Sequence, residues 1–162
     1  MRIYVASVTA LVFALAAPAI ASAKPSVTLK LSGSLVTKAA DGHLVATPVE
    51  KATLHPGDAV EYEIAAQNVG SSPALKLSPA GAIPAGTAYV DGSARAAHAR
   101  VEFSLDHGKT WSAAPTIVVK NADGTTSLKK APPSLYSAIR FVTDGALAPH
   151  ASAAYAYEVR VK

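Results

Sequence analysis

The sequence predicts an all-β fold, an immunoglobulin-like antiparallel β-sandwich of about eight or nine strands that follows an N-terminal signal peptide. Two observations lead to this prediction. Short runs that alternate apolar and polar residues recur about every ten residues, with turn-forming residues between them. No segment after the first 23 residues shows the sustained apolar period of about 3.6 residues that an amphipathic helix needs. A small barrel is the alternative arrangement of such strands.

The first residues have the parts of a secretory signal peptide. Arg2 supplies a positive charge, residues 3–17 are largely apolar, and the small residues Ala21 and Ala23 suit the pocket of a signal peptidase. We expect cleavage after Ala23, which makes residues 1–23 the signal peptide.

An uncleaved membrane anchor is the alternative reading of this segment. It is disfavoured because the apolar stretch is shorter than the roughly 20 residues that span a bilayer and meets Pro18 at its end. The mature chain, residues 24–162, is then one β-sandwich domain, exported to the periplasm or out of the cell. We expect it to have no transmembrane segment.

The composition of the mature chain limits its partners. It has no cysteine, so burial and hydrogen bonds must hold it together without disulfides. Without Arg2, 14 Lys and Arg remain against 11 Asp and Glu, a formal charge of +3. The basic residues are scattered, and Lys129-Lys130 is the only adjacent pair, so we expect no nucleic-acid partner.

The first half of the mature chain predicts three strands. Residues 26–35 form a half-buried first strand, and residues 44–54 form a second that Pro48 confines to an edge or a bulge. Residues 59–67 alternate most regularly, so one face of this strand packs and the other is wet. The apolar faces are Val27, Leu29, Leu31 and Leu35 in the first strand and Val60, Tyr62, Ile64 and Ala66 in the third.

Shorter strands are predicted in the second half. Asp91-Gly92 indicates a hairpin, and the polar, proline-containing stretch 125–134 is expected to be a loop. The last strand places Tyr155, Tyr157, Val159 and Val161 on one face. The predicted strands of this half are 74–78, 87–90, 101–105, 116–120, 137–143 and 153–161.

Two short motifs around the third strand have predicted structural roles. His55-Pro56-Gly57-Asp58 suits a type II turn, because Pro56 fixes the first central φ and Gly57 accepts the positive φ of the second. Beyond the strand, Asn68 supplies a side chain that can bind backbone groups, and Gly70 supplies an unrestricted residue. Together they are expected to end the strand.

Residues 54–93 carry four motifs in a fixed order: a Pro-Gly-Asp turn, a tyrosine-containing strand, an Asn-x-Gly stop and an Ile-Pro-x-Gly-Thr loop. This stretch resembles the bacterial cell-surface conserved repeat domain, also called the domain of unknown function eleven. The resemblance implies an immunoglobulin-like sandwich in exported proteins, commonly in tandem copies and with no assigned catalysis. This chain has one copy, and it lacks the acidic residue that usually precedes the Ile-Pro loop.

Residues 104–111, Ser-Leu-Asp-His-Gly-Lys-Thr-Trp, resemble the Asp box of sialidases and other β-propeller proteins. Asp106 can accept N–H bonds within the turn, Gly108 can take a positive φ, and Trp111 can lie under the hairpin as an apolar floor. We expect a structural role for the box, because one turn cannot build a propeller and a turn motif alone confers no activity.

No catalytic, cofactor-binding or metal-ligating set is predicted. The five histidines fall in loops or at strand ends without ligand spacing. No serine sits in a Gly-x-Ser-x-Gly elbow. Glu61 and Glu63 share a strand face about 7 Å apart, a spacing compatible with an acid/base pair. Nothing near them in the sequence sets them apart as acid and base, so we interpret them as solvated carboxylates.

The sequence therefore predicts an exported, non-enzymatic module with a structural or protein-interaction role in the bacterial envelope or outside the cell, without a cofactor. The expected partner is an envelope or surface protein, and strand addition at a sheet edge is one way to bind it. The alternative is a periplasmic protein that binds glycans or anions. An unprotected sheet edge would favour the first function, and a concave aromatic patch would favour the second.

Overall fold

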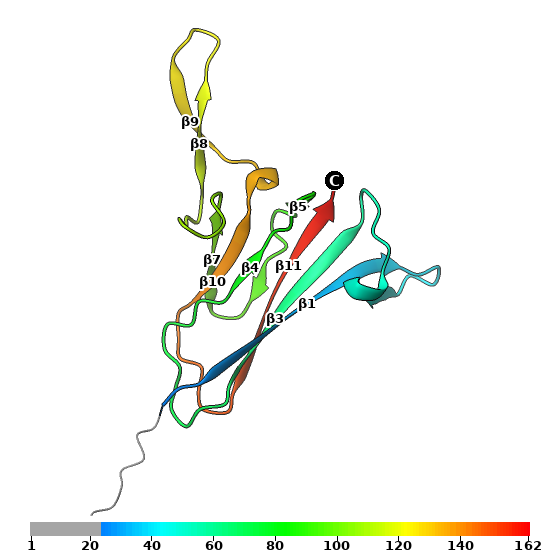
Figure 1. Ribbon diagram of the computed structural model, residues 1–162, viewed down its shortest axis with the longest axis vertical. Helices are drawn as coiled ribbons and strands as arrows, with labels where there is room; N and C mark the ends of the chain where they lie inside the picture. The colour runs from blue at the N-terminus through cyan, green and yellow to red at the C-terminus, as the bar shows by residue number, and fades with distance from the viewer. Residues whose placement is uncertain (1–23) are drawn as a thin grey trace, which may run out of the picture.

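The chain forms two antiparallel β-sheets that pack face to face, together with a separate two-stranded hairpin (Figure 1). The computed structural model describes residues 24–162, and the predicted signal peptide lies outside them. The predicted all-β class is confirmed. The strands of this part are β1 (Val27–Lys38), β2 (Leu44–Pro48), β3 (Ala59–Asn68), β4 (Ala80–Ala82), β5 (Thr87–Tyr89), β6 (Arg95–Ala96), β7 (Ala99–Ser104), β8 (Thr116–Lys120), β9 (Thr126–Lys130), β10 (Ala138–Thr143) and β11 (Ser152–Val161).

The larger sheet has the order β2-β1-β3-β11-β5, and β6 also pairs with β11. In β3, Val60, Ile64 and Ala66 are buried while Glu63 and Gln67 are exposed, so the predicted alternation is confirmed. Pro48 ends β2 at the edge of this sheet, where its missing N–H leaves no ladder bond unmade. The short 3-10 helix η1 (Val49–Lys51) follows directly.

The smaller sheet has the order β4-β10-β7. One link to the larger sheet is the hydroxyl of Tyr157, which donates a hydrogen bond to the Ala82 carbonyl at 2.7 Å. A Cβ at Gly81 would collide with the Tyr157 ring, so only glycine fits where the two sheets approach here. A second 3-10 helix, η2 (Pro133–Leu135), precedes β10.

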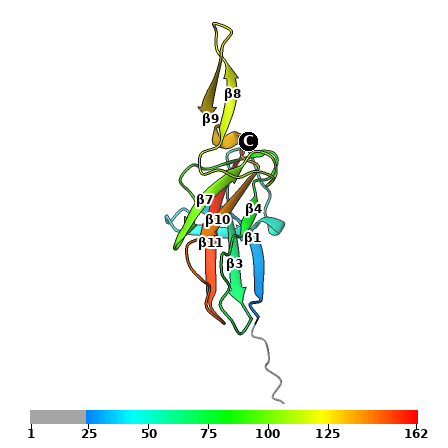
Figure 2. The ribbon, with the colours of Figure 1, turned by 90° about the vertical axis from the view of Figure 1, so that its left-hand side faces the viewer.

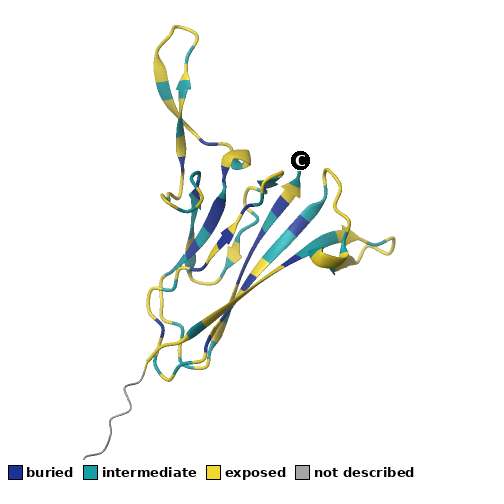
Figure 3. Cartoon of the chain, in the orientation of Figure 1, coloured by how far each residue is buried: buried dark blue, intermediate teal, exposed yellow. Residues whose placement is uncertain are grey.

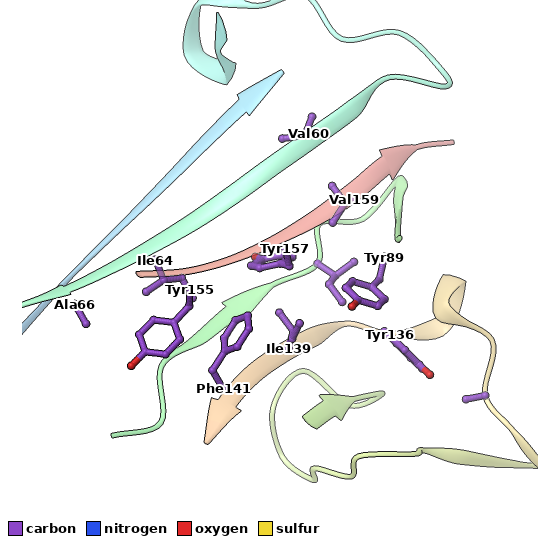
Figure 4. Packing of buried hydrophobic residues seen from close by; sticks show 12 residues of the cluster. Val60, Ile64, Ala66, Tyr89, Tyr136, Ile139, Phe141, Tyr155, Tyr157 and Val159 are labelled. Carbon is purple, nitrogen blue, oxygen red and sulfur yellow. The ribbon is translucent and has the colours of Figure 1, made fainter. Parts of the chain in front are cut away.

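The core between the sheets is rich in aromatic rings (Figure 4). Phe141 of β10 meets Tyr155 of β11 with ring centroids 5.3 Å apart, and Tyr62 stacks on Tyr157 at 5.4 Å. Burial raises the pKa of Tyr157 well above its usual range. The first contact joins the two sheets, and the second joins β3 to β11, which lies far from it in the sequence.

The structure differs from the predicted elements at several places. The predicted strand 44–54 is a strand only as far as Pro48, because the 3-10 helix η1 takes residues 49–51. Residues 74–78 contribute only a single bridge from Ala74 to Leu147, and β4 forms later. The expected loop 125–134 contains β9, which lacks a β-branched run but pairs with β8 across a turn. Asp91-Gly92 makes a turn without a hairpin, because the flanking β5 and β6 both pair with β11. The eleven strands of the described chain therefore exceed the predicted number.

The β8–β9 hairpin stands away from the two sheets (Figures 1 and 2). Val118 and Leu128 are cross-strand partners, and they are 69% and 71% exposed. An isolated two-stranded hairpin has little stability in water. Within residues 24–162, no helix is long and apolar enough to cross a membrane.

Candidate functional site

The Asp-box turn is held by one carboxylate, that of Asp106. Its Oδ1 accepts hydrogen bonds from the N–H groups of Lys109 and Thr110 at 3.0 and 2.8 Å, and its Oδ2 accepts one from the Thr110 hydroxyl at 2.7 Å. The Ser104 hydroxyl donates to Oδ1 and accepts the Gly108 N–H at 2.8 Å. These bonds, led by that from the Thr110 hydroxyl, hold the pKa of Asp106 far below its usual range. Both carboxylate oxygens therefore serve the turn.

Trp111 lies against this turn, where the sequence predicted an apolar floor, but its side chain is only partly buried. A Cβ at Gly108 would lie 3.3 Å from ring atom Cζ2, and the ring itself is partly exposed. The reason is strand alternation: Ser112 bridges to Phe103, whose side chain faces the core, so the preceding Trp111 points to the outer face. There the Arg140 guanidinium carbon lies 4.8 Å from the ring centroid.

Two shallow cavities of about 280 and 230 Å³ flank the Trp111 ring. Pro115 lines the first and His107 lines the second. Beside them, Arg140 donates to Glu102 at 2.8 Å, and this hydrogen bond lowers the pKa of Glu102. An accessible aromatic ring next to a guanidinium can contact a sugar ring or an anion. No pattern in the sequence indicates that Arg140 and Glu102 lie beside Trp111.

The Pro56-Gly57-Asp58 turn has type II geometry. Asp58 donates its N–H to the His55 carbonyl at 3.1 Å, and Gly57 has a φ of +95°. The Asp58 carboxylate in turn accepts the His55 N–H at 2.8 Å. Gly57 also donates to the Val161 carbonyl at 2.9 Å, which ties the turn to the end of β11.

Asn68 lies at the opposite end of β3, where its fully buried side chain joins three segments. Its Oδ1 accepts the N–H groups of Ser26 and Gly70 at 3.3 and 3.1 Å. Its Nδ2 lies 2.8–3.2 Å from the carbonyls of Ser72, Leu147 and Ala148. A Cβ at Gly70 would collide with the backbone of Lys24 and Ser26, so this stop requires glycine.

The residues for which the sequence predicted structural roles therefore do not converge on one site. Pro56, Gly57 and Asp58 precede β3 and Asn68 ends it, so the length of the strand, about 30 Å, separates them. Asp106 and Trp111 lie in the segment that follows β7 of the smaller sheet.

Glu61 and Glu63 line a surface depression of about 680 Å³ on the outer face of the larger sheet. Arg95 of β6 forms ion pairs with Glu61 and with Glu158, the second at 3.2 Å. The floor is made of alanines, including Ala154 and Ala156. Because the Arg95 guanidinium bridges Glu61 and Glu158, these two carboxylates are ion-paired on the surface.

Three of the five histidines, His98, His107 and His150, lie in turns with φ values between +53° and +61°. Within residues 24–162, no group of three or more histidines and carboxylates lies close enough to hold a metal ion.

The feature that sequence reasoning missed is the edge of the larger sheet. β2 covers β1 only along Ser34–Lys38, so residues 27–33 pair with β3 alone among the described residues. Leu29 and Leu31 lie opposite Ala66 and Ile64 on the core-facing side, yet each is 52% exposed. The expectation that this face of the first strand is half-buried is wrong here, because the smaller sheet does not cover β1 (Figure 3).

In the comparisons with known proteins, no family model matches the chain, and no curated protein or solved structure matches it either.

Proposed function

We propose that this chain is an exported, non-enzymatic module that binds another protein of the bacterial envelope or cell surface by adding a strand to its β1 edge. The single observation that carries this proposal is the free outer side of residues 27–33, which pair only with β3 among the described residues, with Leu29 and Leu31 exposed beside it. In such binding, backbone hydrogen bonds supply affinity, and contacts of alternate side chains supply specificity.

The edge lacks most of the devices that protect sheet edges in monomeric proteins. Residues 27–33 contain no proline and no charged side chain on the core-facing side, and Lys30 is the one charge they carry. A seven-residue edge is long enough for a regular ladder, since strands commonly have about five or six residues.

The contacts of the carboxylates support a non-enzymatic role. Asp106 is engaged within its turn and Glu61 pairs with Arg95, so neither presents the free acid or base that hydrolysis needs. Fluorogenic glycosides, sialosides, esters and peptides test this role. Turnover by the wild-type chain that disappears in Asp106→Ala or Glu61→Gln would contradict it.

Export and an immunoglobulin-like layout are parts of the same proposal. The residues at 1–23 support export, and the two packed antiparallel sheets together with the motifs at 54–93 support the layout. N-terminal sequencing of protein recovered outside the cytoplasm should start at Lys24. An intact Met1 on that material would contradict cleavage.

Crosslinking from the edge tests the binding function. We expect Leu31→Cys, carrying a thiol-reactive photocrosslinker, to give a defined adduct in the envelope fraction, because Leu31 lies at the proposed interface. Leu128→Cys on the hairpin, which is also exposed, is the matched control. No adduct from Leu31, or equal adducts from both positions, would refute binding at this edge.

A second candidate function is glycan or anion binding at Trp111. The observation that favours it is the accessible ring between two cavities with Arg140 beside it. A glycan array or isothermal titration with envelope polysaccharide tests it. Trp111→Ala should abolish any binding, whereas Phe141→Leu in the core should leave it unchanged if the sheet stays folded.

A further inference from the structure

We propose that the strand added to the β1 edge is β1 of a second copy of this chain, paired antiparallel around a two-fold axis at Leu29. This inference rests on the proposed function and names its partner. It follows from the direction of the free backbone groups, the side chains on either face and the position of β2.

The free backbone groups of β1 belong to its odd-numbered residues. Val69 donates its N–H to the Ser26 carbonyl at 2.7 Å, so Ser26 turns its backbone groups towards β3. Because successive residues of a strand alternate sides, Thr28 and Lys30 also face β3, and Leu29 and Leu31 turn their N–H and C=O groups to the open edge. Figure 2 shows this half of β1 at the margin of the molecule.

A two-fold axis at Leu29 satisfies both the backbone and the side chains. It places Leu29 opposite Leu29 of the second copy, and Leu31 opposite Val27, so the exposed apolar side chains cover one another. On the outer face it places Lys30 opposite Thr28. Every odd residue from Val27 to Leu31 then exchanges hydrogen bonds with its counterpart.

The neighbouring registers are less favourable than an axis at Leu29. An axis at Lys30 would set two lysines directly opposite each other, and like charges in that position destabilise a sheet. An axis at Thr28 would set Leu31 opposite Pro25, which has no N–H to donate. An axis at Leu31 would drive the second strand into β2, which already pairs with β1 from Ser34 onward.

The two-fold contact also suits an isologous dimer, in which the same patch serves both copies. The hairpin also carries exposed apolar side chains, Val118 and Leu128, and each of its five-residue strands has only the other as partner in the described chain, so their outer sides are free as well. Docking of a hairpin on the edge is therefore the rival arrangement that the experiment must separate.

A single-cysteine experiment tests the register. The chain has no cysteine, so Leu29→Cys introduces one thiol per copy. Directly opposed residues of a hydrogen-bonded antiparallel pair have Cα atoms about 5.5 Å apart, within the range of a disulfide. We expect the exported chain with Leu29→Cys to form a covalent dimer on mild oxidation, much faster than the matched Leu128→Cys control.

Mass and a charge substitution give the second measurement. Light scattering should show wild-type chain at twice the monomer mass, Leu29→Lys as monomer at the same concentration, and Leu128→Lys still as dimer. Leu29 is half-exposed, so the melting temperature of Leu29→Lys should stay near that of the monomeric fold, and circular dichroism checks its folding.

Three results would overturn the inference: a wild-type chain that is monomeric at all concentrations, equal crosslinking from Leu128→Cys, or a dimer that survives Leu29→Lys. A monomeric wild-type chain whose Leu31 photocrosslinker still labels a different envelope protein would overturn the second-copy assignment while supporting edge binding. The failures of the two proposals are thus distinguishable.

Discussion

Replacing Asn68 by alanine should destabilise the fold more than its small volume suggests. The side chain is fully buried, and its amide makes five hydrogen-bond contacts with backbone groups of the residue before β1, the loop after β3 and the segment before β11. The alanine variant removes these partners from the N–H groups of Ser26 and Gly70 and from the Ser72 carbonyl, whereas the carbonyls of Leu147 and Ala148 keep the N–H groups of Ala74 and Ala151. An unpaired buried polar group costs more than the net value of the bond it loses.

The magnitude follows from the hydrogen count. The amide has two hydrogens to share among the three carbonyls and accepts two N–H groups, so it satisfies four bonds at most. At about 1 kcal/mol for each net bond the loss is about 4 kcal/mol, and water entering the gap reduces it to about 2 kcal/mol. For a domain of this size with about 5–15 kcal/mol of stability, this corresponds to a fall in melting temperature of about 4–8 °C.

Denaturant and thermal melts of Asn68→Ala measure this loss. The matched control is Ser72→Ala, because Asn68 contacts only the Ser72 carbonyl and the control should stay within about 0.5 kcal/mol of wild type. A second variant, Asn68→Asp, sets a carboxylate against three carbonyls, so its folded pKa should be raised. Its deficit should then be smallest below about pH 4 and grow as pH rises. An Asn68→Ala variant within 0.5 kcal/mol of wild type would refute the reasoning.

Three further predictions test other parts of the structure. Gly81→Ala should destabilise strongly, because its Cβ meets the Tyr157 ring, whereas Gly145→Ala, which has open space and an ordinary φ, should be neutral; equal melting temperatures would contradict the close approach of the sheets. The stability that the Asp106 carboxylate contributes is present above its unfolded pKa of about 3.9 and is lost as pH falls through the lower folded pKa. In acid titrations, the difference in unfolding free energy between wild type and Asp106→Asn should therefore shrink below about pH 4. Trp111→Ala should lower the stability less than Phe141→Ala, because Phe141 is fully buried and Trp111 is not. About 3–5 kcal/mol is expected for Phe141→Ala. The reverse order in urea melts would show that the Trp111 ring packs as a core residue.

The sequence predicted an element correctly where the local pattern of residues alone determines its structure. Alternation in β3 and β11 predicted their buried faces, since Val60, Ile64, Tyr155 and Tyr157 are all core residues. The Pro56-Gly57 turn followed from the φ preferences of the two residues. In these elements the local pattern and the tertiary contacts agree.

Features that depend on distant segments could not be predicted. The sequence marks Asn68 as a stop, but its contacts with Leu147 and Ala148 join residues about 80 positions apart. The Asp-box motif predicts that the Trp111 ring lies under the turn. It does not indicate which face of the smaller sheet the ring takes. A different reason applies to β9, where a loop was predicted. Its residues are mostly polar, and it forms a strand because the turn after β8 brings it back alongside that strand.

The exposure of Leu29 and Leu31 has its origin in the short strand β4. A sheet covers its neighbour only as far as its own strands extend, and β4 has three residues between Pro79 and Pro84. Pro84 has no N–H to donate to a further strand, and the Ala82 carbonyl on the same outer side of β4 is taken by the Tyr157 hydroxyl, so β4 offers few free groups to a strand beyond it.

The smaller sheet therefore stops short of β1, and the two leucines keep an apolar character that the core of one copy does not use. Exposed leucines beside an unpaired edge promote aggregation unless a specific partner covers them. A two-fold pairing at Leu29 removes both liabilities at once, because it satisfies the backbone of the edge and buries the leucines against each other.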